Sequence, residues 1–396
     1  MLAIEYHKSV PRYLAARYLG PHASGLYTSP LGTTRLTDKP PPRLPTDAWV
    51  RVRPLLAGIC GSDLATLTAQ GTPYFSPLTS TPFVFGHEVV GEVTETGAAA
   101  DGVQVGDRVV LEPALHCVIR GVAEPCASCR ASNFSHCENP THGALAAGFQ
   151  TGYCQDTGGG WSQGFVAHAR QLHRVPDDLP DDRAVLVEPF SCCLHAALQA
   201  PLAEAELVIV MGGGTIGLLT TAAVRAAGYT GRMLVVAKHP HQQERARDLG
   251  ADEVLGTPDL HSRLATRLGT EIHRPELGGP VVLGGADVLF ECVGSEQSLG
   301  DALRFTRPRG TVVLVGMPAM PRTVDWTAIW HKELVVRGAY TSTTPTFERT
   351  IAVMGTLRDR LAGIVGARFP LTRYKEAIDT ALHAGSRGIV KTVFEP

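Results

Sequence analysis

The sequence lacks three features, and each absence excludes a class of protein. It has no run of about 18 apolar residues, so it predicts no transmembrane helix. It has no basic block, and its 36 Lys and Arg against 38 Asp and Glu give a net charge of −2, which argues against nucleic-acid binding. Its N-terminus lacks the apolar core of a signal peptide, and Glu5 interrupts any transit-peptide pattern. We expect a soluble, cytoplasmic protein without a membrane partner.

The 396 residues are enough for two or three domains. Residues 1–50 are punctuated by Pro and Gly and predict irregular connections and edge strands. From Trp49 onward, short apolar runs separated by turns predict a β-rich part. After Pro189, strands alternate with helices, which predicts a parallel sheet. The expected fold is α/β: a β-rich domain over 1–189, a doubly wound Rossmann domain over 190–335, and a tail, 336–396, that returns to the first domain.

A glycine-rich loop follows the apolar strand LVIVM and precedes a helix. In this G-x-G-x-x-G pattern the glycines permit a tight turn, backbone approach to a pyrophosphate, and close helix packing. Strand, loop, helix and second strand occur in order, so we predict dinucleotide binding by Gly212, Gly213, Gly214, Thr215, Ile216 and Gly217.

The carboxylate that usually binds the adenosine ribose of NAD is missing about 20 residues after this loop. Ala237 occupies that place, and Lys238 and His239 follow where a 2′-phosphate would lie. This favours NADP over NAD. The alternative is that Lys238 and His239 are solvated loop residues.

Two Gly-flanked loops contain ligands of the kind that bind zinc. Cys60 lies in AGICGSD, and His87 lies with Glu88 in FGHEVVGEV. Thiolate, imidazole and carboxylate suit an open Zn²⁺ site, and Glu188 in LVEPFSCCLHA is the candidate third ligand. Elsewhere, four of the nine cysteines fall within 21 residues, which indicates a metal rather than disulfides.

The segment from Gly86 to Ala100 fits the pattern GHE-x2-G-x5-[GA]-x2-[IVSAC], and the chain thereby resembles the zinc-containing medium-chain dehydrogenases. GICGSD, GDRV, the glycine loop, DVLFECVG and GTVVLVGM occur in the order and spacing of that family. The resemblance covers nearly the whole chain from residue 45 and implies a GroES-like catalytic domain. Glu at 188, rather than Cys, is similar to the branch of polyol, threonine and sugar dehydrogenases.

The resemblance also implies roles for single residues. Cys60, His87 and Glu188 correspond to the catalytic zinc ligands, with Glu88 beside the metal. Asp63 corresponds to a residue that orients the His87 imidazole, and Ser62 to the hydroxyl that passes the substrate proton, although Ser62 could also be an ordinary turn serine. Polyol-branch members often carry a His shortly after CGSD, but Leu64, Ala65 and Thr66 stand here.

The clustered cysteines correspond to the family's structural zinc lobe. Its usual spacing begins C-x2-C, but Ala occupies position 123, so the nearest first ligand is Cys117. The expected set is Cys117, Cys126, Cys129 and Cys137, with a degenerate site or a ligand such as His136 as the alternative.

We therefore expect a zinc-dependent dehydrogenase that transfers a hydride between a nicotinamide cofactor, favoured as NADP, and a polar secondary alcohol, sugar, polyol or cyclitol, or its ketone. An NAD-dependent threonine- or sorbitol-type dehydrogenase is the alternative within enzymes. A catalytically silent dinucleotide-binding relative is the alternative from another class. The family resemblance further implies a homo-oligomer, a dimer or a tetramer.

Overall fold

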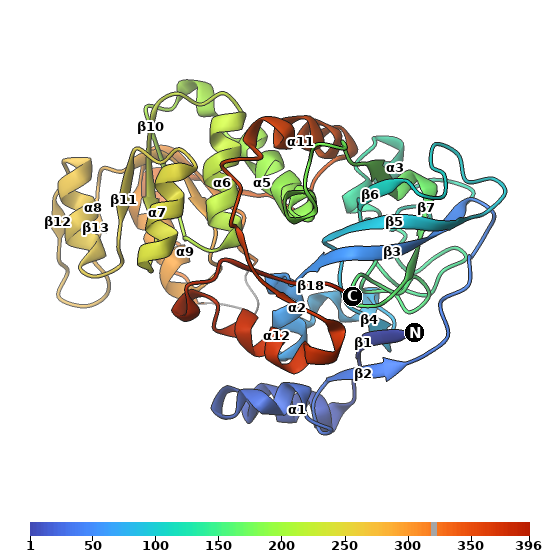
Figure 1. The fold of residues 1–396 in the computed structure, drawn as a ribbon. Coiled ribbons are helices and arrows are strands. Elements are labelled where there is room, and N and C mark those ends of the chain that lie inside the picture. The colour runs from blue at the N-terminus through green and yellow to red at the C-terminus, as the bar shows by residue number, and fades with distance from the viewer. Residues whose placement is uncertain (318–322) are drawn as a thin grey trace. The chain divides into compact units, whose positions relative to one another are not determined.

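The computed structural model describes residues 1–317 and 323–396, and the chain divides into two compact units. Unit 1 contains Met1–Glu188 and Thr343–Pro396, and unit 2 contains Pro189–Ser342. Figure 1 shows the order of helices and strands along the chain. Each unit is described by itself below.

Unit 1 is built on two β-sheets. The larger sheet has the order β17-β18-β3-β5-β6-β8, with β7 also paired to β3. Its strands are β3 (Trp49–Gly58), β5 (Val89–Thr96), β6 (Arg108–Leu111), β7 (Phe165–His168), β8 (Leu172–Arg174), β17 (Val365–Phe369) and β18 (Lys391–Phe394). The smaller sheet contains β1 (Leu2–Tyr6), β2 (Thr34–Asp38) and β4 (Phe83–Val84). The two last strands of the chain therefore lie in the same sheet as β3.

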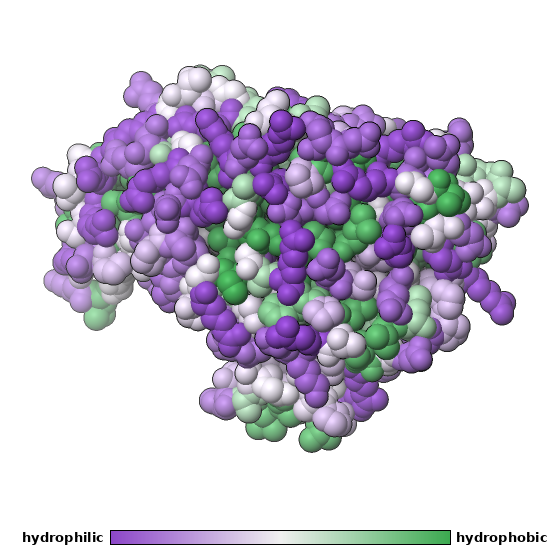
Figure 2. Space-filling view, in the orientation of Figure 1, coloured by the Kyte–Doolittle hydropathy of each residue, from purple (hydrophilic) through white to green (hydrophobic). Residues whose placement is uncertain are grey.

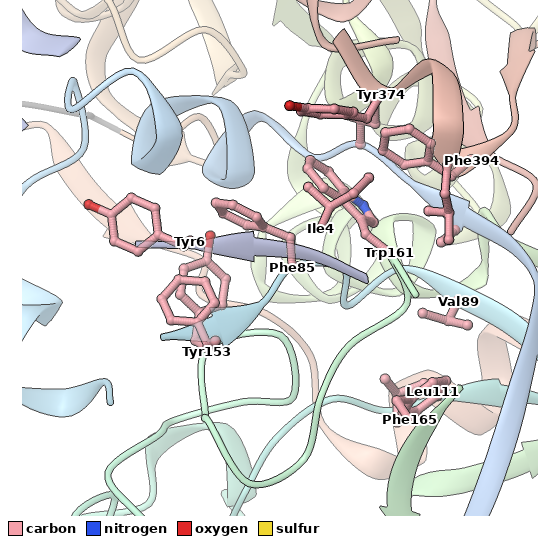
Figure 3. Close-up of a cluster of buried hydrophobic side chains, with 14 of the residues drawn as sticks. Ile4, Tyr6, Phe85, Val89, Leu111, Tyr153, Trp161, Phe165, Tyr374 and Phe394 are labelled. Carbon is pink, nitrogen blue, oxygen red and sulfur yellow. The ribbon is translucent and has the colours of Figure 1, made fainter. Parts of the chain in front are cut away.

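Apolar residues explain the strands of unit 1: β1, β7 and β18 are buried over nearly their whole length, and β5 is buried over its first half. The aromatic core joins distant segments: Tyr6, Phe85, Tyr153, Trp161 and Phe394 belong to one cluster of buried side chains (Figure 3). The Trp161 indole donates its N–H to the Gly58 carbonyl at 2.9 Å, so that this buried nitrogen is satisfied. This core fixes the end of β3, where the first predicted metal ligand follows.

Unit 1 also contains helices. They are α1 (Val10–Tyr18), α2 (Gly61–Leu67), α3 (Ala127–Arg130), α4 (Asp181–Ala184), α11 (Thr344–Leu357) and α12 (Tyr374–Leu382). The helix α1 departs from the expectation of only irregular structure and edge strands before Trp49. Its sequence explains the difference, because Pro11 stands in the first turn and helix-favouring Leu14, Ala15, Ala16 and Arg17 follow.

Unit 2 is a six-stranded parallel sheet of order β11-β10-β9-β14-β15-β16 with flanking helices. The strands are β9 (Leu207–Met211), β10 (Arg232–Val236), β11 (Glu253–Leu255), β14 (Ala286–Glu291), β15 (Thr306–Leu314) and β16 (Val335–Gly338). The helices are α6 (Thr215–Ala226), α7 (Pro240–Asp248), α8 (Leu260–Leu268), α9 (Glu296–Phe305) and α10 (Thr327–Lys332), after α5 (Val187–Gln199), which spans the unit boundary. A two-stranded ribbon, β12 (Ile272–His273) and β13 (Val281–Val282), is added.

The visible surface is mostly hydrophilic, with scattered apolar groups (Figure 2). One such group lies over α1, where Val10, Leu14 and Tyr18 are exposed at intervals of four residues. Within residues 1–317 and 323–396, every helix is too short or too polar to cross a membrane.

Candidate metal and cofactor sites

Three of the predicted metal-site residues converge in unit 1. The Sγ atom of Cys60, a ring nitrogen of His87 and a carboxylate oxygen of Glu88 all lie within 4.8 Å of one another. Cys60 follows β3 and is the N-cap of α2, and His87 and Glu88 lie between β4 and β5. These donors fit Zn²⁺, which binds Cys, His and carboxylate ligands at 2.0–2.3 Å.

The loop that carries His87 needs a glycine before it. Gly86 has φ +101°, and a Cβ there would lie 2.6 Å from a ring carbon of Trp161. Any larger residue would therefore be strained and would displace the core beside the ligands.

Asp63 lies behind this cluster, as expected for an orienting residue. Its side chain is fully buried, and its Oδ2 accepts the N–H of Cys60 at 3.0 Å. Its Oδ1 lies 3.5 Å from His87 Nδ1. Burial opposes the charged imidazole, but the Asp63 carboxylate raises the pKa of His87 well above its usual value. The carboxylate thus favours a proton on Nδ1, which leaves the other ring nitrogen for a metal.

Glu88 is held by Lys391, a residue that the sequence analysis missed. The Lys391 ammonium on β18 donates to Glu88 Oε2 and to the Ile59 carbonyl, the latter at 3.1 Å. Both side chains are almost fully buried. Burial lowers the pKa of Lys391, but the Glu88 carboxylate outweighs it and raises the pKa above its usual value. The only sequence signal was a cation within the apolar strand IVKTVF.

Glu188 and Ser62 lie outside this three-residue group. Glu188 is buried at the beginning of α5, and its role as third ligand remains a prediction. Among the described residues, Glu88 is the third residue whose ligand atom lies within 4.8 Å of those of Cys60 and His87. The Ser62 hydroxyl, in the first turn of α2, is buried and makes no hydrogen bond of good geometry among the described residues, although it interacts with the Tyr153 hydroxyl.

Tyr153 is the second residue that the sequence analysis missed at this site. Its hydroxyl lies 3.5 Å from Asp63 Oδ1 and 3.4 Å from Thr66 Oγ1. Burial raises the pKa of this phenol, so it is a neutral donor at physiological pH. GFQTGYCQDTGGGWS carried no pattern that connected Tyr153 with Asp63, which lies 90 residues away.

The four clustered cysteines also converge. The Sγ atoms of Cys117, Cys126, Cys129 and Cys137 all lie within 4.8 Å of one another. The longer first loop therefore still brings Cys117 to the group, with its sulfur 3.6 Å from that of Cys137. A four-sulfur set with no open position fits a structural Zn²⁺ site.

Several N–H groups point at these sulfurs. Cys117 Sγ accepts the Cys126 N–H at 3.4 Å and the Asn139 side-chain amide at 3.3 Å, and Cys126 Sγ accepts the Glu138 N–H at 3.4 Å. Burial opposes ionisation of Cys126, but the backbone N–H groups of Glu138 and Cys129 and the neighbouring thiols lower its pKa to about 7, whereas burial raises the pKa of Cys129 and Cys137. Metal binding would therefore release protons from this cluster.

In unit 2 the glycine loop lies between β9 and α6, as predicted. Gly212 has φ +122°, and a Cβ on Gly217 would lie 1.9 Å from the Gly212 carbonyl oxygen. Gly214 is the N-cap of α6, so Thr215 and Ile216 form the first turn, whose N–H groups can bind an anion. A Cβ on Gly213 would lie 2.6 Å from the Cβ of Ala237, which places this loop beside the end of β10.

Lys238 and His239 follow β10 directly. Lys238 is exposed, and His239 is the N-cap of α7. The residue directly after β10 is the buried Ala237, which carries no carboxylate. Burial, and after it the neighbouring His241 and Lys238, lower the pKa of His239.

Comparison with known proteins decides the family. The model of the alcohol dehydrogenase GroES-like domain matches residues 46–177, and that of the zinc-binding dehydrogenase matches residues 215–356. The chain belongs to the zinc-binding medium-chain dehydrogenases. It is an oxidoreductase with a GroES-like domain and a Rossmann-type domain, and the members of this family use zinc, a nicotinamide cofactor and a small-molecule substrate.

The relatives of this dehydrogenase include two plant enzymes. The chain is 30% identical to L-idonate 5-dehydrogenase of Vitis vinifera, over 75% of this chain and 74% of that one. It is 31% identical to sorbitol dehydrogenase of Arabidopsis thaliana, over 74% and 73%. A zinc-binding dehydrogenase from Sinorhizobium meliloti 1021, solved with NADP bound, is similar with a TM-score of 0.71 and 25% identity over 92% and 95% of the two chains.

Proposed function

We propose that this dehydrogenase oxidises a secondary hydroxyl of a polyol or sugar, or reduces the corresponding ketone, with NADP as the preferred cofactor. The observation that carries the proposal is the convergence of Cys60, His87 and Glu88, with the buried Ser62 hydroxyl two residues after Cys60, in the part of the chain that the structure describes. Relatives named for idonate and sorbitol support the substrate class.

Cys60, His87 and Glu88 would hold the catalytic zinc, with Glu188 as the further carboxylate that the family resemblance implies. When bound, the zinc supplies a Lewis acid that lowers the pKa of an alcohol, and the nicotinamide supplies the hydride acceptor. Asp63 orients His87, Lys391 holds Glu88, and the Ser62 hydroxyl accepts a hydrogen bond from the substrate hydroxyl. Cys117, Cys126, Cys129 and Cys137 would hold the structural zinc.

Within unit 2, the N-terminus of α6 and its glycine loop would bind the pyrophosphate. Lys238 and His239 would bind the 2′-phosphate of NADP, since no carboxylate at 237 repels it. The double variant A237D/K238Q should shift the ratio of kcat/KM values toward NAD. Lys375→Gln, an exposed lysine on α12 of unit 1, is the control. An unchanged ratio would contradict the NADP assignment.

The deciding experiment measures reduced-nicotinamide absorbance with NADP⁺ and NAD⁺ in parallel, across polyols, sugars, amino alcohols and simple secondary alcohols. We expect turnover of a polyol or sugar that a zinc chelator abolishes. Turnover of amino alcohols alone, with NAD⁺, would favour the threonine-type alternative. An absence of turnover in protein that holds two zinc ions per chain would favour the catalytically silent alternative.

We also infer that the protein forms a homo-oligomer through β16. All four residues of this edge strand are exposed, and the nearby Trp326 and Trp330 are 66% and 82% exposed. An exposed edge with apolar side chains is a template for pairing with the same strand of a second copy. Light scattering should give a dimer or larger, and Val336→Lys should give a monomer. A monomeric wild-type protein would contradict this inference.

A further inference from the structure

The phenol of Tyr153 meets the metal-ligand cluster from a loop that is distant in sequence. Its side chain is 5% exposed, and its ring centroid lies 6.0 Å from that of His87. Its hydroxyl donates to Asp63 Oδ1 at 3.5 Å. One side chain thus contacts both the imidazole and the carboxylate that orients it.

The surroundings of Asp63 show why this contact matters. The carboxylate is fully buried, so it needs donors from the protein. The Cys60 N–H donates to Oδ2 and the Tyr153 hydroxyl donates to Oδ1, while His87 Nδ1 lies 3.5 Å from Oδ1. Without the phenol, Oδ1 would face only His87, and the carboxylate could shift relative to the imidazole.

The ring of Tyr153 is held independently of the metal ligands. It stacks on Phe149 with centroids 5.1 Å apart and packs against Phe83 at 5.0 Å. Its backbone N–H donates to the Gln150 carbonyl at 3.1 Å, and that of Thr151 to the Pro113 carbonyl at 2.9 Å. The hydroxyl is therefore preorganised by the fold.

The segment before Tyr153 is equally fixed, and by a residue of the cysteine lobe. Arg120 is fully buried, three residues after Cys117. Its guanidinium donates to four carbonyls in 142–148, those of His142, Leu145, Ala146 and Gly148, at 2.6–3.0 Å. The chain that Arg120 fixes leads directly into Phe149 and Tyr153.

We propose that Tyr153 is a positioning residue of the catalytic metal centre: its hydroxyl fixes Asp63 and, through Asp63, the orientation of the His87 ligand. The inference rests on the proposed zinc-dependent function. Tyr153 also interacts with Ser62, but its hydrogen bond goes to Asp63, so its loss should alter the metal itself.

The test replaces Tyr153 by Phe, which keeps the ring and removes only the hydroxyl. Tyr374→Phe is the matched control, since Tyr374 is also buried in unit 1 and donates to the Thr28 carbonyl at 3.3 Å. The readouts are Zn²⁺ affinity in chelator competition, the visible absorption of Co²⁺-substituted protein, and kcat and KM.

We expect Tyr153→Phe to bind one of its two Zn²⁺ ions roughly 10- to 100-fold more weakly than the wild type. The absorption bands of the Co²⁺-substituted variant should shift, and kcat should fall with little change in the KM for the cofactor. Tyr374→Phe should match the wild type in all three. Thr66→Val, which removes one further contact of the Tyr153 hydroxyl, should shift the same readouts less, and it decides the matter if Tyr153→Phe does not fold.

Unchanged metal affinity and cobalt absorption in Tyr153→Phe, with an active wild type, would overturn the role of Tyr153 alone. A wild type that takes up a single Co²⁺ per chain, lost in Cys117→Ser, would overturn both this inference and the proposed function. The two failures are therefore distinguishable.

Discussion

Lys391 and Glu88 form a buried ion pair that joins the last strand of the chain, β18, to the metal-ligand loop before β5. The two side chains are 3% and 1% exposed. A buried carboxylate without a cation is unfavourable, and the Lys391 ammonium also satisfies the Ile59 carbonyl. The pair therefore holds the Glu88 carboxylate beside Cys60 and His87.

Lys391→Met should lower the free energy of unfolding by about 3–5 kcal/mol, because it leaves the Glu88 carboxylate buried without its cation. The double variant E88Q/K391M should recover part of this loss, since it also removes the charge. Urea unfolding of the three zinc-loaded proteins measures both values. A double variant no more stable than Lys391→Met would show that the carboxylate charge is not the cause.

Removing Arg120 should be among the most destabilising changes in the cysteine lobe. Its guanidinium donates to four carbonyls, of which the hydrogen bonds to Leu145 and Gly148 are buried, and an unsatisfied buried group costs about 1–3 kcal/mol. Arg120→Met should thus cost roughly 3–5 kcal/mol in urea unfolding. Arg130→Met is the control, because Arg130 is exposed and contacts one carbonyl. Equal losses of unfolding free energy in Arg120→Met and Arg130→Met would contradict a special role for the Arg120 hydrogen bonds.

Cys117→Ser should remove one zinc ion per chain and leave the other. The sulfur of Cys117 lies with three other cysteine sulfurs within 4.8 Å, and replacing a thiolate by a hydroxyl weakens a four-sulfur site. Elemental analysis of the purified variant measures the content, and Cys192→Ser, outside both ligand groups, is the control. Retention of two zinc ions by Cys117→Ser would exclude Cys117 as a ligand and favour a neighbour such as His136.

Local patterns in the sequence predicted part of this site. The glycine loop, Cys60 and His87 were predictable because their chemistry depends on spacing within a few residues. Lys391 and Tyr153 were not, because β18 and the 149–153 loop reach the cluster only through tertiary packing. The same holds for the buried Arg120, whose four acceptors are backbone carbonyls that no side-chain pattern encodes.

For the fold too, the elements marked by a local sequence pattern were predictable and the others were not. The parallel sheet of unit 2 was predictable because each buried strand is a short apolar run before a helix. The helix α1 was missed because the Pro and Gly of residues 1–50 favoured irregular structure, whereas Pro11 lies in the first turn, where it is tolerated. The ribbon β12–β13 has two residues per strand, too few for any periodicity.

The stability of the folded protein should depend on pH through Lys332 in α10. This lysine is buried, and burial together with the nearby Arg304 lowers its pKa to about 8 from an ordinary value of 10.5. Its ammonium donates to the Arg304 and Thr306 carbonyls, both at 2.7 Å. Between pH 8 and 10.5 the unfolded chain therefore binds more protons at this residue than the folded one, so raising the pH favours the folded state.

The wild type should accordingly gain stability relative to Lys332→Met as the pH rises from 7 to 10, because other titrating groups cancel in the difference. Urea unfolding at pH 7, 8, 9 and 10 measures it. Lys375→Met, an exposed lysine on α12, should give a difference that does not change with pH. If the difference in unfolding free energy between the wild type and Lys332→Met is also independent of pH, Lys332 stays protonated over this range, with its charge stabilised by the two carbonyls.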